Sequence, residues 1–299
     1  MKIRTEILNK TVKSNFQTET GNAVVDYYTE AGPDYEAWSK NFNMHFGFST
    51  KAFDCLSREK MLQSMNQLVI DSLILNKGDT VIDIGCGLGA TVRYGAEKFP
   101  DINFKGLTIT PWQVKKSGEL IDQLGLKNAE VIFGDYNSLV LDDNSIDGVY
   151  GLESICHAEG TDKTGPLNEA YRVLKVGGRF TMVDGFTKKP EGDLSPIVKI
   201  MYDTVCDNWA LPSLPNISDV VYRMKCLGFK DIDVKEISWQ IAPSAIHAPF
   251  LTLLFFLKSF LKGEKLGKQS WKNLKACFTI FFLGLNRKSV GYYKITAKK

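Results

Sequence analysis

The sequence predicts an α/β protein with an open parallel sheet that helices cover on both faces. From residue 79 onward, short apolar runs alternate with helical stretches, which is typical of right-handed βαβ units. The chain has 299 residues, of which 44% are hydrophobic and 24% are charged. This composition excludes disordered, collagen-like and mucin-like proteins, and the length suits one or two domains.

The predicted elements follow one another in a regular order. A strand at 79–85 leads into a helix at 91–99, which Pro100 ends. A second strand at 103–110 leads into a helix that runs from Pro111 to Gly125, with each of these residues at the helix end that favours it. Further strands are predicted at 129–135, 145–153, 178–186 and 231–239, and a further helix at 165–175.

We expect one composite domain with three parts. Residues 1–75 are polar, rich in aromatic residues and predicted to form a helical cap. Residues 76–187 hold the alternating strands and helices of a ligand-binding core, and residues 188–299 hold a substrate-side insert, the last strands and C-terminal basic and apolar helices. The net charge of +3 is too small to indicate nucleic acid as a partner, although residues 258–299 alone carry +10.

The cysteines and the first residues indicate a reducing compartment. The spacing of the six cysteines fits neither a disulfide framework nor a zinc site, and the start, MKIRTEILNK, lacks the apolar run of a secretory signal. We therefore expect a cytoplasmic protein and no metal. The cysteines are Cys55, Cys86, Cys156, Cys206, Cys226 and Cys277.

Glycines follow the first predicted strand. Asp83 precedes the run Gly85-Cys86-Gly87-Leu88-Gly89, in which glycines permit a tight turn and a close approach of a ligand to the backbone. The pattern is G-x-G-x-G rather than the dinucleotide pattern G-x-G-x-x-G. Taken alone, it fits an ordinary tight turn as well as a ligand site.

Polar residues also follow the next two strands. Thr108, Thr110 and Gln113 can hydrogen-bond to ribose hydroxyls, but no acid stands where NAD-binding proteins place one. After the third strand, Asp135 can accept from an adenine amino group and Tyr136 can stack on the base. Since the carboxyl ends of parallel strands meet at one edge of a sheet, these residues should converge on a nucleoside.

These motifs resemble those of class I S-adenosylmethionine-dependent methyltransferases. The similarity covers roughly residues 60–186 and includes VIDIGCGLG, GLTITPWQ, GDY, SIDGVYGLESICHA and EAYRVLKVGGRF. It implies a Rossmann-like, seven-stranded sheet with N-terminal and C-terminal helical lid segments, and S-adenosylmethionine as the cofactor. The residues that it assigns to the cofactor are Asp83, Gly85, Gly87, Thr108, Thr110, Gln113, Asp135, Tyr136, Leu152, Tyr28 and His45.

Other segments resemble sterol C24-methyltransferases and related terpenoid C-methyltransferases. They are the aromatic segment around Tyr27-Tyr28, Tyr35-Glu36 and 43–48, the run 153–158 (ESICHA), and Arg287-Lys288-Ser289. The Gly-Trp-Gly run of the sterol family is replaced by AWSKNFN, so sterols, prenyl diphosphates and other terpenoids remain alternative acceptors.

Methylation of an alkene carbon leaves a carbocation, which then has to lose a proton. We expect Glu153 to stabilise the cation and act as base, with His157 one helical turn away and Tyr35 as a second candidate base. Aromatic faces at Tyr27, Tyr28, Tyr35, Trp38, Phe46 and Phe48 could line a lid over the site. The alternatives are an acid–histidine pair for N- or O-methylation of a small metabolite, and a non-catalytic cofactor-binding module.

The C-terminal segment combines apolar and basic residues. Residues 245–261 are strongly apolar, but Pro249 and Lys258 leave a run that looks too short to cross a membrane. Lysines then recur every three or four residues up to Lys275, and Gly263 and Gly267 should separate two helices. This pattern indicates peripheral contact with an anionic membrane, with a lid or a homo-oligomer face as the alternatives. A small hydrophobic substrate is expected in either case.

Overall fold

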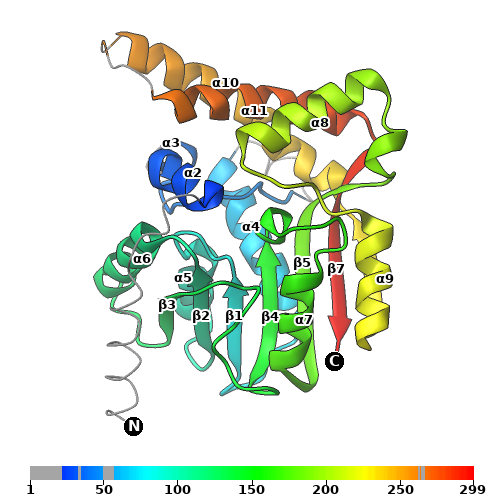
Figure 1. Ribbon diagram of the computed structural model, residues 1–299. Helices are drawn as coiled ribbons and strands as arrows, with labels where there is room; N and C mark the ends of the chain where they lie inside the picture. The colour runs from blue at the N-terminus through cyan, green and yellow to red at the C-terminus, as the bar shows by residue number, and fades with distance from the viewer. Residues whose placement is uncertain (1–21, 33–34, 50–56, 262, 264–266) are drawn as a thin grey trace.

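The computed structural model describes residues 22–32, 35–49, 57–261, 263 and 267–299, and it confirms the predicted α/β fold (Figure 1). A single seven-stranded sheet has the order β3-β2-β1-β4-β5-β7-β6. β1 to β5 run parallel, and β7 runs antiparallel between β5 and β6. The strands are β1 (Thr80–Ile84), β2 (Asn103–Thr108), β3 (Ala129–Phe133), β4 (Ile146–Leu152), β5 (Leu174–Thr187), β6 (Lys230–Glu236) and β7 (Val290–Lys298).

The strand order places a switch point at the centre of the sheet. The chain passes from β1 outward to β2 and β3, then returns to β4 on the other side of β1. The connections after β1 and β4 therefore leave in opposite directions and open a crevice at the carboxyl ends of these two strands. Asp83 and Glu153 lie at this point.

Two apolar cores lie on the two faces of the sheet. Side chains of β1 alternate between them, so that Val81 packs with α4 (Arg58–Asp71) and α5 (Ala90–Lys98), whereas Ile82 packs with α7 (Thr164–Val173) and α9 (Ile217–Leu227). Burial on both faces explains the continuous apolar runs of the parallel strands. α6 (Pro111–Gln123) contacts β2 and β3.

A layer of helices lies across the carboxyl edge of the parallel strands. Figure 1 shows α10 and α11 at the top of the molecule beside α8, with α2 and α3 below them. Their bounds are α2 (Ala23–Ala31), α3 (Tyr35–Trp38), α8 (Pro196–Asn208), α10 (Ser238–Leu261) and α11 (Lys268–Leu285). These helices close the crevice from above.

Two predicted boundaries were wrong. The strand predicted at 178–186 already begins at Leu174, which pairs with Ile146 of β4. The apolar C-terminal helix begins at Ser238 and contains Pro243 and Pro249, so among the described residues it is the one helix long and apolar enough to cross a membrane. The expectation that this run is too short was therefore wrong.

Parts of several other predictions lie outside the described residues. They are residues 1–21 of the predicted cap, Cys55, Lys262 and Lys265. The division of the chain into three parts stays a prediction.

A matched pair of helical glycines tests the packing of α5 on the sheet. A Cβ added at Gly95 would lie 2.6 Å from Cζ of the buried Phe104, whereas one added at Gly118 in α6 would meet nothing within 4 Å. Gly95→Ala should lower the free energy of unfolding by about 1–3 kcal/mol through overpacking. Gly118→Ala should raise it by about 0.5–1 kcal/mol, because alanine favours the helix. Urea titration measures both, and equal effects would contradict the packing described.

Candidate active site

The turn after β1 is formed by glycines in the left-handed region. Gly85, Gly87 and Gly89 have φ values of 95°, 54° and 68°. A Cβ at Gly85 would lie 2.5 Å from Cβ of Ser154, and one at Gly87 would lie 3.0 Å from Sδ of Met44. The turn therefore requires glycine both for its backbone conformation and for the space around it.

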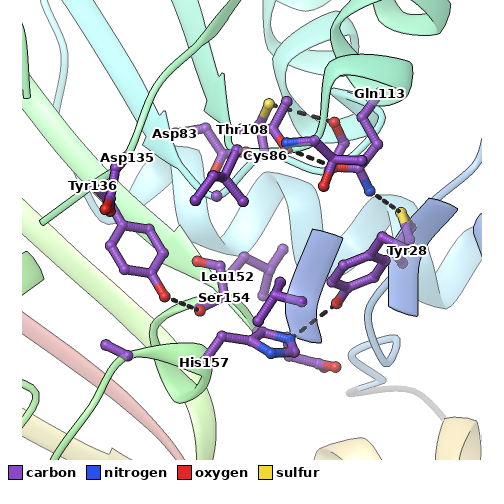
Figure 2. Close-up of a pocket in the computed structure, with 18 of the residues that line it drawn as sticks. Tyr28, Asp83, Cys86, Thr108, Gln113, Asp135, Tyr136, Leu152, Ser154 and His157 are labelled. Carbon is purple, nitrogen blue, oxygen red and sulfur yellow. Dashed lines mark hydrogen bonds between the residues drawn. The ribbon is translucent and has the colours of Figure 1, made fainter. Parts of the chain in front are cut away.

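All of the predicted cofactor-binding residues line one cavity of about 420 Å³ at the carboxyl edge of β1, β2, β3 and β4. Figure 2 shows Tyr136 and Gln113 on opposite sides of this cavity, with Ser154 and Leu152 between them. The convergence of the strand ends thus follows the expectation from a parallel sheet. Met44 and Ser154 also line the cavity and were not anticipated.

Two buried oxygens of this cavity have no hydrogen-bond partner among the described residues. They are Oδ1 of Asp83 and Oγ1 of Thr110. Burial raises the pKa of Asp83 to about 8. Tyr150 interacts with this carboxyl group and acts to lower its pKa, but a buried oxygen without a partner still costs free energy unless a ligand supplies a donor or a positive charge, so this cavity is suited to a cationic ligand.

The other predicted residues of the first cavity are partly held by protein contacts. Thr108 Oγ1 donates to Gln113 Oε1 at 2.6 Å, which fixes the amide and turns Nε2 toward Met44 Sδ, 3.9 Å away. Asp135 Oδ1 accepts from the backbone N–H of Asn137 at 2.8 Å, and Tyr136 donates to the carbonyl of Ser154 at 3.4 Å. Gln113 and Asp135 are thereby oriented before any ligand binds.

His45 lines the cavity, but its ring nitrogens are engaged by protein groups. Nε2 lies 2.9 Å from Asn66 Oδ1 and 3.2 Å from Asn43 Oδ1, and Nδ1 lies 2.9 Å from the carbonyl of Phe46. Burial lowers the pKa of His45 to about 4, so the ring is neutral at pH 7. These contacts fix the segment that carries Met44 and Phe46.

A second, mostly apolar cavity of about 430 Å³ lies beside the first one, under α10 and α11. The two cavities share five lining residues, which are Tyr28, Met44, His45, Glu153 and His157. Most of the aromatic residues predicted to line a lid line the second cavity, namely Tyr27, Tyr35, Trp38 and Phe46. Phe48 instead packs in the core with α4.

Glu153 is held in the wall between the two cavities. It follows β4 directly and has a φ of 48°, an uncommon conformation for a residue other than glycine that is typical of functional sites. Oε1 accepts hydrogen bonds from the backbone N–H of Phe46, at 2.7 Å, and from the hydroxyl of Tyr292. Burial raises the pKa of Glu153 to about 8, although both hydrogen bonds act in the opposite direction.

His157 does not form the predicted pair with Glu153. The residues after Glu153 form a short 3₁₀ helix (Ile155–His157) instead of an α-helical turn, and no hydrogen bond joins the two side chains in the described structure. Nδ1 lies 3.3 Å from the carbonyl of Ala210, so it carries the proton, and Nε2 accepts from Tyr28 at 3.0 Å (Figure 2). Burial lowers the pKa of His157 to about 4.

Tyr35 lies in the second cavity, and its hydroxyl is 3.3 Å from that of Tyr27. Tyr27 in turn donates to Oδ1 of Asn273 at 2.7 Å, which connects α2, α3 and α11. Tyr292, which the sequence did not single out, takes the position beside Glu153.

Asp184 is a second buried carboxyl group of the apolar cavity that the sequence did not reveal. Its oxygens accept from the backbone N–H groups of Cys156, at 3.1 Å, and Gly185, at 2.9 Å, and burial raises its pKa to about 6. Among the described residues, no group of three or more His, Cys, Asp or Glu side chains could hold a metal ion.

The raised pKa of Glu153 makes a prediction about stability. The folded state keeps the proton up to about pH 8, whereas the unfolded chain loses it near 4.5, so stability falls as the pH rises between these values. Glu153→Gln should therefore raise the free energy of unfolding by roughly 2–4 kcal/mol at pH 9 and change it little at pH 4. Urea titrations at both pH values measure this difference.

The exposed Glu97 supplies the control. Glu97→Gln should leave the free energy of unfolding nearly unchanged at both pH values. If Glu153→Gln behaved in the same way, the carboxyl group would not be buried as described.

Comparison with known proteins shows which proteins this chain is similar to. Residues 75–211 match a family model described as a methyltransferase domain. The chain is 27% identical over 216 residues to 24-methylenesterol C-methyltransferase 2 of Arabidopsis thaliana, covering 72% of this chain and 58% of that one. It is 25% identical over 257 residues to sterol 24-C-methyltransferase of Kluyveromyces lactis, covering 83% and 65%. The chain thus spans less than two thirds of the length of these relatives.

Solved structures show the same fold at lower identity. Mycolic acid cyclopropane synthase CmaA1 has a TM-score of 0.80 at 16% identity, covering 95% of this chain and 100% of that one. The [4+2]-cyclase SpnF has a TM-score of 0.75 at 19% identity, covering 94% and 96%. Geranyl diphosphate C-methyltransferase from Streptomyces coelicolor has 0.70 at 13%, covering 94% and 98%. These structures share the fold, the match at residues 75–211 is to a methyltransferase domain, and the chain resembles sterol C24-methyltransferases.

Proposed function

We propose that this protein transfers a methyl group from S-adenosylmethionine to a carbon of an isoprenoid or sterol-like lipid. The observation that carries the proposal is the position of Glu153 in the wall shared by a polar cavity, formed by the ends of parallel strands, and an apolar cavity. A group that faces both cavities is placed to act where a nucleoside cofactor and a lipid meet.

The first cavity suits S-adenosylmethionine. This cofactor carries a positive charge, and the unpartnered oxygen of Asp83 supplies a buried carboxyl group for it. Thr110 and Gln113 offer hydrogen-bonding groups for a ribose, and Asp135 and Tyr136 offer an acceptor and a ring for a base. When bound, the cofactor supplies a methyl group on a sulfonium; the chain itself supplies binding and orientation.

The second cavity suits an apolar acceptor. A new bond forms between the methyl carbon and one alkene carbon while the carbon–sulfur bond breaks, which leaves a cation on the other alkene carbon. The Glu153 carboxylate and the faces of Tyr28 and Phe46 stabilise this charge. Glu153 then takes a proton from the adjacent carbon, and the electron pair of that C–H bond forms the new double bond.

Tyr292 positions the proposed base. Both hydrogen bonds to Glu153 fall on Oε1, one from Tyr292 and one from the backbone of Phe46, so we assign Oε2 as the atom that receives the proton. Gly185 lies directly opposite Tyr292 in the β5–β7 pair, and a Cβ added there would meet nothing within 4 Å.

Charge in the second cavity favours an uncharged acceptor over a prenyl diphosphate. Its lining contains the carboxyl groups of Glu153 and Asp184 and the neutral ring of His157. Arg287 also lines it, but its guanidinium is paired with Glu236. A diphosphate would meet two carboxyl groups and one cation, which is paired with Glu236 through one terminal nitrogen and keeps a buried Nε without a partner among the described residues.

Two alternative functions can be compared with this proposal. Among the described residues no hydrogen bond joins Glu153 to His157, so the acid–histidine pair expected for N- or O-methylation of a small metabolite has no support from their contacts. A non-catalytic cofactor-binding module would have the same first cavity but would not need Glu153. One protein of this fold is named as a [4+2]-cyclase.

A cytoplasmic location and a homo-oligomer stay predictions.

The pH dependence of turnover tests the role of Glu153. Because the base has to be ionised, turnover of an alkene lipid should rise as the pH passes through about 8. Glu153→Gln should lower turnover by roughly 10²- to 10⁴-fold with little change in cofactor affinity. Tyr292→Phe removes a hydrogen bond that lowers the pKa of Glu153, so the midpoint of the pH–rate profile should move upward.

Tyr293→Phe is the matched control, because the hydroxyl of Tyr293 lies 3.3 Å from Oε2 of Glu236 and not at Glu153. Its pH–rate profile should keep the wild-type midpoint. Full turnover by Glu153→Gln would exclude Glu153 as the base and indicate that another group removes the proton.

Cofactor affinity should depend on the ionisation of Asp83. Because burial raises the pKa of Asp83 to about 8, binding of the cationic cofactor at pH 7 should release a proton, and affinity should rise with pH toward 9. Asp83→Asn should weaken binding by roughly 10- to 100-fold and abolish the proton release. Calorimetry in two buffers of different ionisation enthalpy measures both, and proton uptake on binding would contradict this assignment.

A further inference from the structure

The outer side of α10 and α11 is apolar and exposed to solvent. Figure 1 shows both helices at the top of the molecule, at the end of the sheet where the parallel strands finish. We call the exposed apolar side chains of these two helices the roof face. Its members, each between 41% and 83% exposed, are Trp239, Ile246, Phe250, Leu253, Leu254, Leu257, Phe260, Leu261, Trp271, Phe278, Phe282 and Leu285.

The spacing of these residues makes each helix carry a continuous stripe. Positions 250, 254, 257 and 261 fall on one side of α10, and positions 271, 278, 282 and 285 fall on one side of α11. Soluble monomers seldom expose a large contiguous apolar patch unless it meets a membrane or another protein. We therefore expect the roof face to be covered by a membrane or by another protein.

Charge on the two helices indicates which occupant fits. Lys258 lies in the α10 stripe between Leu254 and Leu261, and Lys268 and Lys275 lie in the α11 stripe. Neither helix contains an acidic residue. A second copy seated on this face would bring lysine against lysine, whereas anionic headgroups would pair with the lysines while the apolar side chains enter the acyl region.

The second cavity opens on the roof face. Trp239, Ile246 and Leu285 line this cavity and are 76%, 46% and 63% exposed. A molecule that leaves the acyl region between these residues would enter the cavity without crossing water. The acceptor cavity and the exposed apolar surface are thus one continuous apolar path.

α10 is anchored in the protein and so lies on a bilayer rather than crossing it. Its inner side is buried at Ile241, Ser244 and Ala248, and Oγ of Ser244 accepts from the backbone N–H of Gly47 at 2.7 Å. A spanning orientation would remove these contacts and the cover of the second cavity, although Ser238–Leu261 is long and apolar enough to span.

We propose that the roof face docks on an anionic bilayer surface and that the second cavity takes its acceptor from that bilayer between Trp239, Ile246 and Leu285. The docking step is inferred from the residues of the roof face alone and does not depend on the proposed function. The second step rests on the proposed function, since it identifies the cavity as the acceptor site.

Vesicle binding by the full chain tests the docking step. The protein should sediment with vesicles of phosphatidylcholine and phosphatidylserine, bind vesicles of phosphatidylcholine alone more weakly, and lose affinity as salt is raised. Leu254→Glu/Leu261→Glu should lower the affinity by at least about tenfold, since it places two acids in the stripe. Val140→Glu/Val176→Glu is the matched control, because both valines are exposed and lie outside α10 and α11, and it should bind as the wild type does.

Turnover in two settings tests the uptake step. With an acceptor dissolved in detergent, the Leu254→Glu/Leu261→Glu variant should match the wild type, whereas with the same acceptor embedded in vesicles it should be at least about tenfold slower. Normal vesicle binding without methyl transfer in either setting would refute the proposed function and leave the docking intact. Equal slowing in both settings would refute uptake from the bilayer.

Two results would overturn the docking proposal. In the first, the wild type would stay in the supernatant with both kinds of vesicle, or the acidic variant would sediment as well as the wild type. In the second, the wild type would be a dimer that the acidic substitutions dissociate, and vesicle binding would be absent. The roof face would then be an interface between copies of this chain.

Discussion

The site depends on a carboxyl group kept inside the protein, between a polar and an apolar cavity. Burying an ionisable group is costly unless it is neutralised or hydrogen-bonded, and Glu153 uses both solutions. Its pKa is raised to about 8, and two donors from distant segments, Phe46 and Tyr292, hold one of its oxygens. The strained backbone at Glu153 persists because the end of β4, the segment before α4 and strand β7 all fix the residue in place.

The two cavities come from different parts of the fold. The ends of the parallel strands form the polar cavity, where the glycine turn, Asp83 and the residues after β2 and β3 meet. Helices placed above this edge form the apolar cavity, with β7 closing one side. Because Glu153 stands at the end of β4, next to the switch point of the sheet, it faces both cavities, and the proposed transfer to a lipid acceptor rests on this position.

The polar half of the site could be predicted from the sequence, and the apolar half only in part: aromatic residues such as Tyr35 and Phe46 line the second cavity as expected, whereas Tyr292 could not be predicted. Asp83 and Thr108 lie in the last residues of strands that the apolar runs reveal, Asp135 follows the next strand, and parallel strands bring such residues to one edge. Tyr292 is 139 residues from Glu153, and it reaches the carboxyl group through the antiparallel register of β7 with β5, which no local pattern specifies.

Local geometry explains why His157 does not pair with Glu153, and tertiary packing explains why α10 begins earlier than the apolar run. The 3₁₀ turn after Glu153 places His157 beside Tyr28, because a helix of about three residues per turn rotates each successive side chain further than an α-helical turn would. α10 continues through Pro243 and Pro249, residues that normally end a helix, because its inner side packs on α3, α4 and α11. Periodicity alone could not show this packing, so the beginning of the helix was placed too late.

The identity of the methylated product tests the central claim most directly. The wild-type protein is incubated with methyl-labelled S-adenosylmethionine and a mixed lipid extract, and every labelled product is identified by mass spectrometry. A labelled, uncharged lipid that carries the methyl group on carbon and has lost one proton is the result that the account predicts. Label on a nitrogen or oxygen of a polar metabolite, or no labelled product while the cofactor is bound, would contradict it.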